Sequence, residues 1–156
     1  MSSKIEDENR AVMMLEKSIL RAKSILEKEQ KLKPFAMILY DDGSIKTIHN
    51  QVEDPEESYV LLQSGLKIRV KEGGVDVIVL LIDTIIPERF SKVGILEGIR
   101  VHIEEKSKDS ERVGARFLYV PYQLCKTASN NEIFADLYPP VPMSFPAEFI
   151  LFKENS

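Results

Sequence analysis

The amino-acid sequence predicts an α+β domain with a mainly antiparallel sheet of five or six strands and two main helices. Three observations lead to this prediction. Two segments carry apolar side chains at helical spacing, several others have the length and composition of strands, and the strands come in runs instead of alternating with helices. The predicted order is α-β-β-α-β-β-β, with both helices on one face of the sheet and an extended, proline-containing C-terminal tail.

The first predicted helix spans residues 6–33. Its apolar side chains recur at three- and four-residue steps and form one stripe, made of Val12, Leu15, Ile19, Ala22 and Leu26 and widened by Ala11, Met14 and Ile25. Met13 and Leu20 project well away from this stripe, so we expect some apolar surface to be left for a partner. Pro34 ends the helix, because the residue before a proline is pushed out of the helical region.

Residues 35–49 have the pattern of a β-hairpin. Residues 35–40 form an apolar run of strand length, and residues 45–49 form the return strand. Between them, Asp42 and Gly43 suit a tight turn in which both central residues have positive φ.

The second predicted helix begins after Asp54, a good N-cap residue, and ends at Gly73. Pro55 suits the first helical position, and Glu57 stands three residues after the cap, as in a capping box. One side carries an apolar stripe of Tyr59, Leu62, Leu66 and Val70, and the opposite side carries Leu61 and Ile68. A helix that is apolar on two sides is usually covered on two sides, and the first helix is the candidate cover for its back.

Three further strands are predicted. Residues 75–86 consist almost entirely of β-branched residues and leucine, which indicates a central strand buried on both faces. Residues 98–104 alternate, so that Ile99, Val101 and Ile103 are expected to point inward and Arg100, His102 and Glu104 outward. A charged turn then leads to a strand over residues 112–120.

The C-terminal part differs in composition from the rest. We expect one domain over residues 1–156, with the helix at 6–33, the α+β core at 35–123 and a short helix and wrapping tail at 124–156. The short helix is predicted at 132–137. Four prolines in the segment that follows require an extended course, and residues 147–152 suit a sixth, edge strand.

Composition argues against several classes of function. The net charge of −4 disfavours nucleic-acid binding through broad electrostatic attraction. The single cysteine, Cys125, can form neither an internal disulfide nor a multi-cysteine zinc site. The longest apolar run is too short to cross a membrane, and the first residues lack the pattern of a signal peptide. The expected location is therefore cytoplasmic.

Asp83, His102 and Cys125 are the candidate catalytic residues. Asp83 interrupts an apolar strand, so it either pairs with an arginine or lines a pocket as a general base, and Asp76 is expected on the opposite face. Cys125 would need a base such as His102 within hydrogen-bonding reach. His102 and Glu104 match the H-x-E half of the zinc deaminases, but the P-C-x-x-C half is absent, so an exposed polar face is expected.

A pocket between the sheet and the C-terminal tail is the candidate ligand site. Its aromatic lining and one cation would come from Tyr119, Tyr122, Phe134, Tyr138, Phe145 and Arg116. A mixed metal site would require His49 and His102 to meet beside a carboxylate, and no spacing rule supports it. No phosphate-binding loop, nucleophile elbow or calcium loop occurs, so neither a cofactor nor a metal is predicted.

The sequence favours a non-catalytic protein-interaction or regulatory module that acts as a homodimer or binds another protein. This prediction rests on the surplus apolar side chains of the first helix, the proline-bearing tail, the edge strand and the lack of a complete catalytic set. The alternative is a small enzyme or small-molecule-binding protein with the aromatic pocket. Nucleic acid and membrane are not expected partners.

Overall fold

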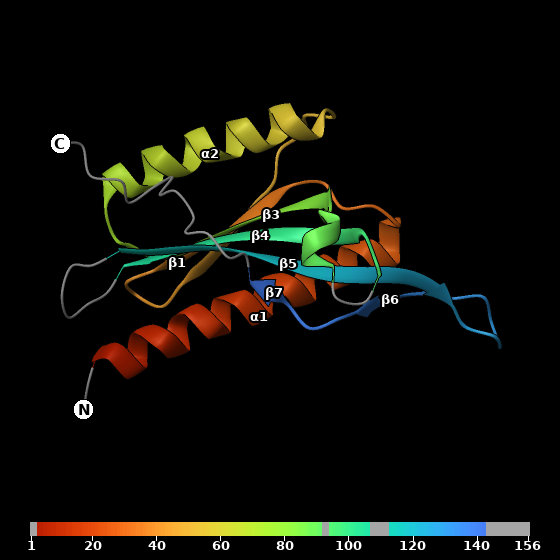
Figure 1. Cartoon of the computed structure of the whole chain (residues 1–156). Coiled ribbons are helices and arrows are strands. Elements are labelled where there is room, and N and C mark those ends of the chain that lie inside the picture. Colours follow the sequence, from red (N-terminus) through yellow and green to blue (C-terminus); the bar gives the residue numbers. More distant parts are fainter. Residues whose placement is uncertain (1–2, 92–93, 107–112, 143–156) are drawn as a thin grey trace.

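The computed structural model describes residues 3–91, 94–106 and 113–142, and it confirms the α+β class and the predicted order of the first seven elements (Figure 1). The helices and strands are α1 (Ser3–Glu29), β1 (Phe35–Tyr40), β2 (Ile45–Ile48), α2 (Pro55–Glu72), β3 (Val75–Ile85), the short 3-10 helix η1 (Glu88–Phe90), β4 (Glu97–Lys106), β5 (Val113–Lys126), β6 (Ile133–Leu137) and β7 (Val141–Pro142).

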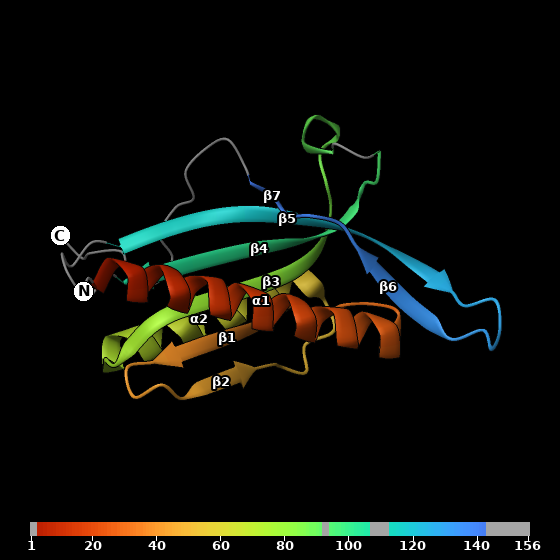
Figure 2. The same cartoon turned by 90° about the horizontal axis from the view of Figure 1, so that it is seen from below.

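The strands form one antiparallel sheet in the order β2-β1-β3-β4-β5-β6, with β7 beside β5. β3 lies between β1 and β4 and is buried on both faces over most of its length, as its composition predicts. The sheet is curled, and β6 extends from it along the far end of β5 (Figure 2).

The two helices lie on opposite faces of the sheet, so the prediction that both cover one face is wrong (Figure 1). Phe35 and Met37 of β1 pack in the core beneath α1, whereas Ala36 and Ile38 pack beneath α2. Successive residues of a strand point to opposite faces. Because β1 and β3 are apolar at nearly every position, each face needs its own cover.

The side of α1 that faces the sheet follows the edge of the predicted stripe that Ala11 and Met14 widen. Its fully buried positions are Ala11, Met14, Ser18, Ala22 and Leu26. Val12, expected in the stripe, is 52% exposed, and Met13 packs partly against the core. Small side chains at three of the five buried positions let the helix lie close to the sheet. Leu20 is exposed, as expected.

Both ends of α2 follow the predicted capping. The carboxylate of Asp54 accepts a hydrogen bond from the backbone N–H of Glu57 at 3.2 Å, and Pro55 is the first helical residue. The chain leaves the helix at Gly73, whose φ of 93° favours glycine. Tyr59, Leu62 and Leu66 are buried against the sheet, and α1 does not cover the back of the helix.

The β1–β2 hairpin forms as predicted, but its turn is of a different type. Gly43, with φ of 88°, has positive φ and Asp42 does not. The N–H of Gly43 donates to the carbonyl of Tyr40 at 3.0 Å, and the carboxylate of Asp42 accepts from the N–H of Ser44 at 2.9 Å. This is a three-residue loop that ends in a left-handed glycine, instead of a two-residue turn.

Residues 133–137 form strand β6, so the short helix predicted there is wrong. The segment alternates: Ala135 is buried beneath α1 and its neighbour Phe134 is exposed. The N–H of Ala135 also donates to the carboxylate of Glu27 in α1 at 2.9 Å. Alternation of buried and exposed residues is the pattern of a strand, and pairing with β5 provides hydrogen-bond partners for the backbone. The predicted strand at 147–152 and the tail beyond Pro142 lie outside the described residues.

Within the described part of the chain, neither helix has a stretch long and apolar enough to cross a membrane.

Candidate functional site

The two aspartates of β3 both face α1, which differs from the prediction that they face opposite sides. The strand has a register shift opposite Leu39 and Tyr40, and Asp76 is the extra residue of this bulge. The bulge turns Asp76 toward α1, where it forms an ion pair with Arg10. Asp83 stays in regular register and faces the α1-side core by strand alternation.

Asp83 pairs with a phenol instead of the expected arginine. The hydroxyl of Tyr122 donates to Oδ1 of Asp83 at 2.8 Å, and Tyr122 belongs to the core beneath α1. Desolvation raises the pKa of Asp83, although the hydrogen bond from Tyr122 partly offsets it. Desolvation and the nearby carboxylate also raise the pKa of Tyr122. The pair links β3 to β5 and engages one carboxylate oxygen. Asp83 also lines a hollow of about 610 Å³ together with Tyr59 and Arg100, as the pocket-lining alternative expects, and its role as a general base stays a prediction.

His102 and Glu104 lie on the α2-side face of β4 and are 0% exposed, so the predicted solvent-exposed polar face is wrong. Nε2 of His102 and Oε2 of Glu104 are 2.6 Å apart. Their strand neighbours are apolar: Leu80 lies opposite His102, and Ile78 lies opposite Glu104. Nε2 of His102 and Oε2 of Glu104 therefore satisfy each other, whereas Nδ1 of His102 is buried without a hydrogen-bond partner among the described residues.

Aromatic rings and a cation extend this polar pair across the sheet. The ring of Phe117 meets His102 edge-on, with centroids 4.6 Å apart. The guanidinium of Arg100 lies 5.5 Å from the Phe117 ring centroid and 5.2 Å from that of Tyr59 in α2. His102 and Glu104 have no solvent access, and the ring and cation contacts of this layer connect β4 to β5 and to α2.

The structure does not bring the three candidate catalytic residues together. Asp83 faces α1, and His102 faces the α2 side. Cys125 is on β5, eight residues beyond Phe117, the partner of His102 in β4, which separates the two by roughly 25 Å along the strand. His102 is therefore too far from Cys125 to act as the base for its thiol.

The predicted aromatic pocket is also not assembled from the described residues. Tyr119 packs with Ile86 and Val141, whereas Tyr122 lies in the core beneath α1 on the other face. Phe134 is exposed on β6. Tyr138 lines a shallow apolar cleft beside α1, and Arg116 pairs with Glu105 at 2.9 Å. Phe145 lies outside the described residues.

His49 and His102 lie on opposite faces of the sheet. His49 stacks on Phe35, a residue of the α1-side core, while His102 faces the α2 side. In the described part of the chain, no three His, Cys, Asp or Glu side chains come together in a way that could hold a metal ion.

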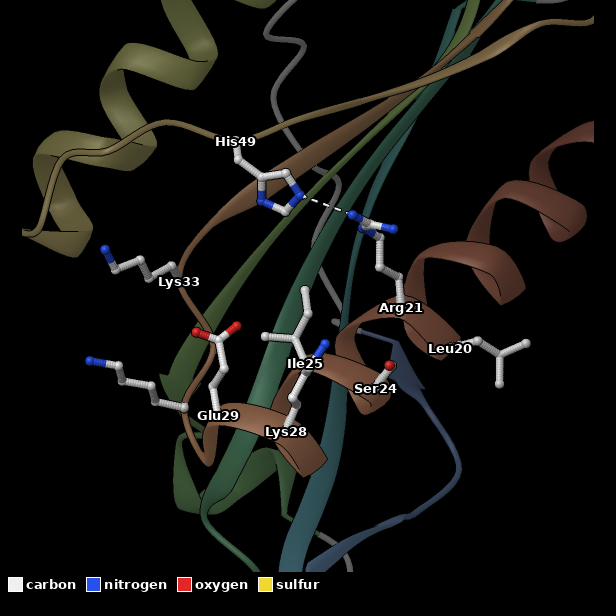
Figure 3. A pocket seen from close by; sticks show the side chains of 9 residues that line it. Leu20, Arg21, Ser24, Ile25, Lys28, Glu29, Lys33 and His49 are labelled. Carbon is white, nitrogen blue, oxygen red and sulfur yellow. Dashed lines mark hydrogen bonds between the residues drawn. The ribbon is translucent and has the colours of Figure 1, made fainter.

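A cleft of about 620 Å³ lies between the C-terminal half of α1, the connection to β1 and the residue after β2 (Figure 3). Its lining residues are Leu20, Arg21, Ser24, Ile25, Lys28, Glu29, Lys31, Lys33 and His49. In Figure 3, Arg21 reaches from α1 toward His49, and Leu20 points away from the other side chains. We call this hollow the basic cleft, because four of its nine residues are cations.

Arg21 and His49 are the paired side chains of the basic cleft. Nη2 of Arg21 is 3.3 Å from Nε2 of His49. An arginine is always a donor, so Nε2 of His49 accepts and the ring proton is on Nδ1. Partial burial lowers the pKa of His49, the charge of Arg21 lowers it further, and Glu29 opposes both. Phe35, with its ring centroid 5.6 Å away, stacks on the imidazole and fixes its plane.

The outer side of α2 is the second candidate site. Leu61 is 54% exposed and Ile68 is 61% exposed, and Ser64 lies between them on the same stripe. Glu57 continues this stripe toward the N-terminus and Lys71 toward the C-terminus, and both are exposed. We call these five residues the α2 stripe. The sequence predicted the two-sided apolar character of this helix, and the structure leaves its back uncovered.

The basic cleft was not predicted from the sequence. Lys28, Lys31 and Lys33 stand within six residues, which is the signal that could have drawn attention to this end of α1. His49 and Arg21 lie near these lysines because the end of β2 comes close to the C-terminal half of α1.

Comparison with known protein families, with curated proteins and with solved structures gives no match, so the function has to be inferred from the chain's own side chains.

Proposed function

We propose that this protein is a non-catalytic interaction module that forms a homodimer by pairing its α2 helices in antiparallel fashion. The observation that carries the proposal is the two-fold complementarity of the α2 stripe. In a two-fold interface, residue i contacts residue j of the partner, and j contacts i. The stripe reads Glu57, Leu61, Ser64, Ile68 and Lys71 along the helix, with an acid at one end and a base at the other.

The antiparallel arrangement matches every position of the stripe with a suitable partner. With Ser64 near the axis, Leu61 meets Ile68 of the second copy, and Glu57 meets Lys71. A parallel arrangement would place each charge against its own copy, which is unfavourable. The same complementarity holds for the helix ends, since the first turn is acidic and the last turn is basic.

The centre of the stripe is suited to close approach. The hydroxyl of Ser64 donates to the carbonyl of Val60 at 3.1 Å, so its burial would leave no donor unpaired. Next to it, Gly65 has open space where a Cβ would stand. A glycine inside a helix destabilises it by about 1 kcal/mol relative to alanine. The fold of the single chain does not require this glycine, whereas a helix crossing at this point uses its small size.

We also propose a cytoplasmic location, where a single thiol such as that of Cys125 stays reduced.

The first test is the oligomeric state of the whole chain and of Leu61→Glu, measured by sedimentation equilibrium. We expect a dimer for the unchanged chain and a dissociation constant weakened by about 100-fold or more for Leu61→Glu. The variant puts a carboxylate against Ile68 of each partner. Val12→Glu is the matched control, because it adds the same charge at an exposed apolar position of α1. A monomer at high concentration, or a dimer broken only by Val12→Glu, would overturn the proposal.

Charge reversal tests the antiparallel pairing itself. Glu57→Lys and Lys71→Glu should each weaken the dimer several-fold, because each creates two like-charge contacts per dimer. The double variant should recover most of the loss, since it restores both pairs with their signs exchanged. Failure of the double variant to recover would show that the stripe does not pair in this way.

Gly65→Ala separates the needs of the helix from those of the interface. We expect the variant chain to be stabilised by about 0.5–1 kcal/mol when measured as a monomer in the Leu61→Glu background. In the otherwise unchanged chain, the added methyl group should weaken the dimer, because it holds the two helices apart. Urea unfolding gives the first quantity and sedimentation the second. An unweakened dimer would contradict close approach at this residue.

A further inference from the structure

The basic cleft holds more positive charge than the composition of the chain would suggest. Arg21, Lys28, Lys31 and Lys33 line it, and Glu29 is the one carboxylate among its nine lining residues. The whole chain carries a net charge of −4. Like charges gathered in one hollow repel each other and attract anions from solution. The cleft is therefore a region of positive potential on an acidic protein.

Ion pairs among the described residues do not neutralise this charge. Lys23, which does not line the cleft, pairs with Glu27 at 2.6 Å. By contrast, the four cleft cations form no ion pair with any residue that the structure describes. The negative end of the α1 dipole accounts for one cation in the last turn, Lys28. It does not account for Arg21, two turns earlier, or for the two lysines beyond the helix.

The guanidinium of Arg21 is held in position before any ligand arrives. His49 accepts its hydrogen bond, and Phe35 stacks on the ring of His49. This bond uses one N–H of a group that has five, so the remaining donors are free to bind an anion. A planar, pre-oriented guanidinium is the group best suited to bidentate binding of a phosphate.

We propose that the basic cleft binds a phosphate monoester of a small organic molecule. Arg21 and the lysines hold the phosphate oxygens, and Ile25 supplies an apolar contact for the organic part. The volume of about 620 Å³ exceeds what a phosphate group fills and is in the range of small-molecule sites. This site lies beneath α1 and does not involve the α2 stripe, so it is independent of the proposed dimer.

The two histidines of the chain provide the test. His49 lines the cleft, and His102 is buried on the opposite face of the sheet. We would titrate the full-length protein with phenyl phosphate and follow the ring signals of both histidines by NMR. We expect the His49 signals to shift and saturate, because bound phosphate changes both its hydrogen bond to Arg21 and the local charge. The His102 signals should stay in place.

Two variants and one control assign the binding to the cleft cations. Arg21→Gln should weaken binding by roughly tenfold or more, because it removes charge-assisted hydrogen bonds to the phosphate. Lys33→Gln should weaken it several-fold. Lys46→Gln is the matched control, since this exposed lysine of β2 belongs to the face away from the cleft. Lys46→Gln should leave the affinity for phenyl phosphate unchanged. Leu61→Glu, which changes the α2 stripe, should also leave it unchanged.

Three results would overturn the proposal. The first is the absence of any His49 shift at millimolar phenyl phosphate. The second is an equal, unsaturating shift of both histidines, which indicates a general effect of ionic strength. The third is an affinity that is the same in Arg21→Gln as in the unchanged chain.

Discussion

The two faces of the sheet differ in where their polar groups lie. Beneath α1, the interior is apolar except for Ser18, whose hydroxyl donates to the carbonyl of Leu15. The ion pair of Arg10 with Asp76 and the hydrogen bond of Arg21 with His49 lie at the edges of this layer. On the other face, the pair His102 and Glu104 lies fully inside. The difference follows from cover: α1 crosses β1, β3, β4 and β6, whereas α2 lies over β1 and β3. His102 and Glu104 belong to β4, next to the two strands that α2 covers.

The largest expected effect comes from breaking the buried pair. Glu104→Ala should destabilise the protein by about 3–5 kcal/mol, because it leaves an imidazole buried without its partner. Leu26→Ala is the matched change in the apolar layer beneath α1, and a cost of about 2–5 kcal/mol is expected there. Urea unfolding measures both.

The two faces differ most clearly in how a second change acts. Replacing His102 and Glu104 together by Leu and Met should cost less than Glu104→Ala alone, since no unpaired polar group is left. No second substitution of this kind is expected to restore the stability lost in Leu26→Ala, because that variant leaves a cavity and not an unpaired polar group. A double variant less stable than Glu104→Ala would contradict this view of the pair.

A smaller effect is expected at Asp83, at the edge of the layer beneath α1. Its pKa in the folded protein is raised by desolvation, so the folded state binds this proton more tightly than the unfolded state does. Stability should therefore fall as pH rises from about 3.9, the ordinary value for aspartate, through the raised pKa, and stay lower above it. Asp83→Asn should flatten this part of the pH profile of the unfolding free energy.

Tyr122→Phe is the counterpart of that variant. It removes the hydrogen bond that favours the charged carboxylate, so the fall in stability should extend to higher pH. A profile unchanged by either variant would show that Asp83 is equally solvated in the folded and unfolded chains.

The smallest effect is expected at His49, on the rim of the basic cleft. Partial burial and the charge of Arg21 place its pKa below the ordinary value of about 6.5. Its contribution to stability is therefore complete above about pH 6.5 and is lost as pH falls through the lowered pKa. Arg21→Gln should raise the pKa measured by NMR titration, and Lys46→Gln should leave it unchanged. A pKa above 6.5 in the unchanged chain would contradict the observed geometry.

Local signals in the sequence determined most of the elements. Asp54 and Gly73 set the ends of α2, and Gly43 marks the hairpin turn, because caps and turns depend on residues within a few positions of each other. The apolar run of β3 likewise identified the central strand. The same local patterns also predicted a helix at residues 132–137, where pairing with β5 and burial of Ala135 decide for a strand.

The two candidate sites, the α2 stripe and the basic cleft, were harder to predict from the sequence than the fold. Leu61 and Ile68 were recognisable as a second apolar side, but their exposure depends on which face of the sheet receives α1. The basic cleft joins residues of α1 to His49, more than fifteen positions beyond the end of the helix.

The sequence by itself determined the α+β class, the order of the first seven elements and the two-sided apolar character of α2. Only the tertiary structure decided that the helices lie on opposite faces, that His102 and Glu104 are buried, and that Arg21 meets His49. Periodicity shows which residues share a side of a helix or strand. Which element covers that side depends on how all the elements pack together. That choice decides which polar groups must find partners in the interior and which apolar groups stay exposed.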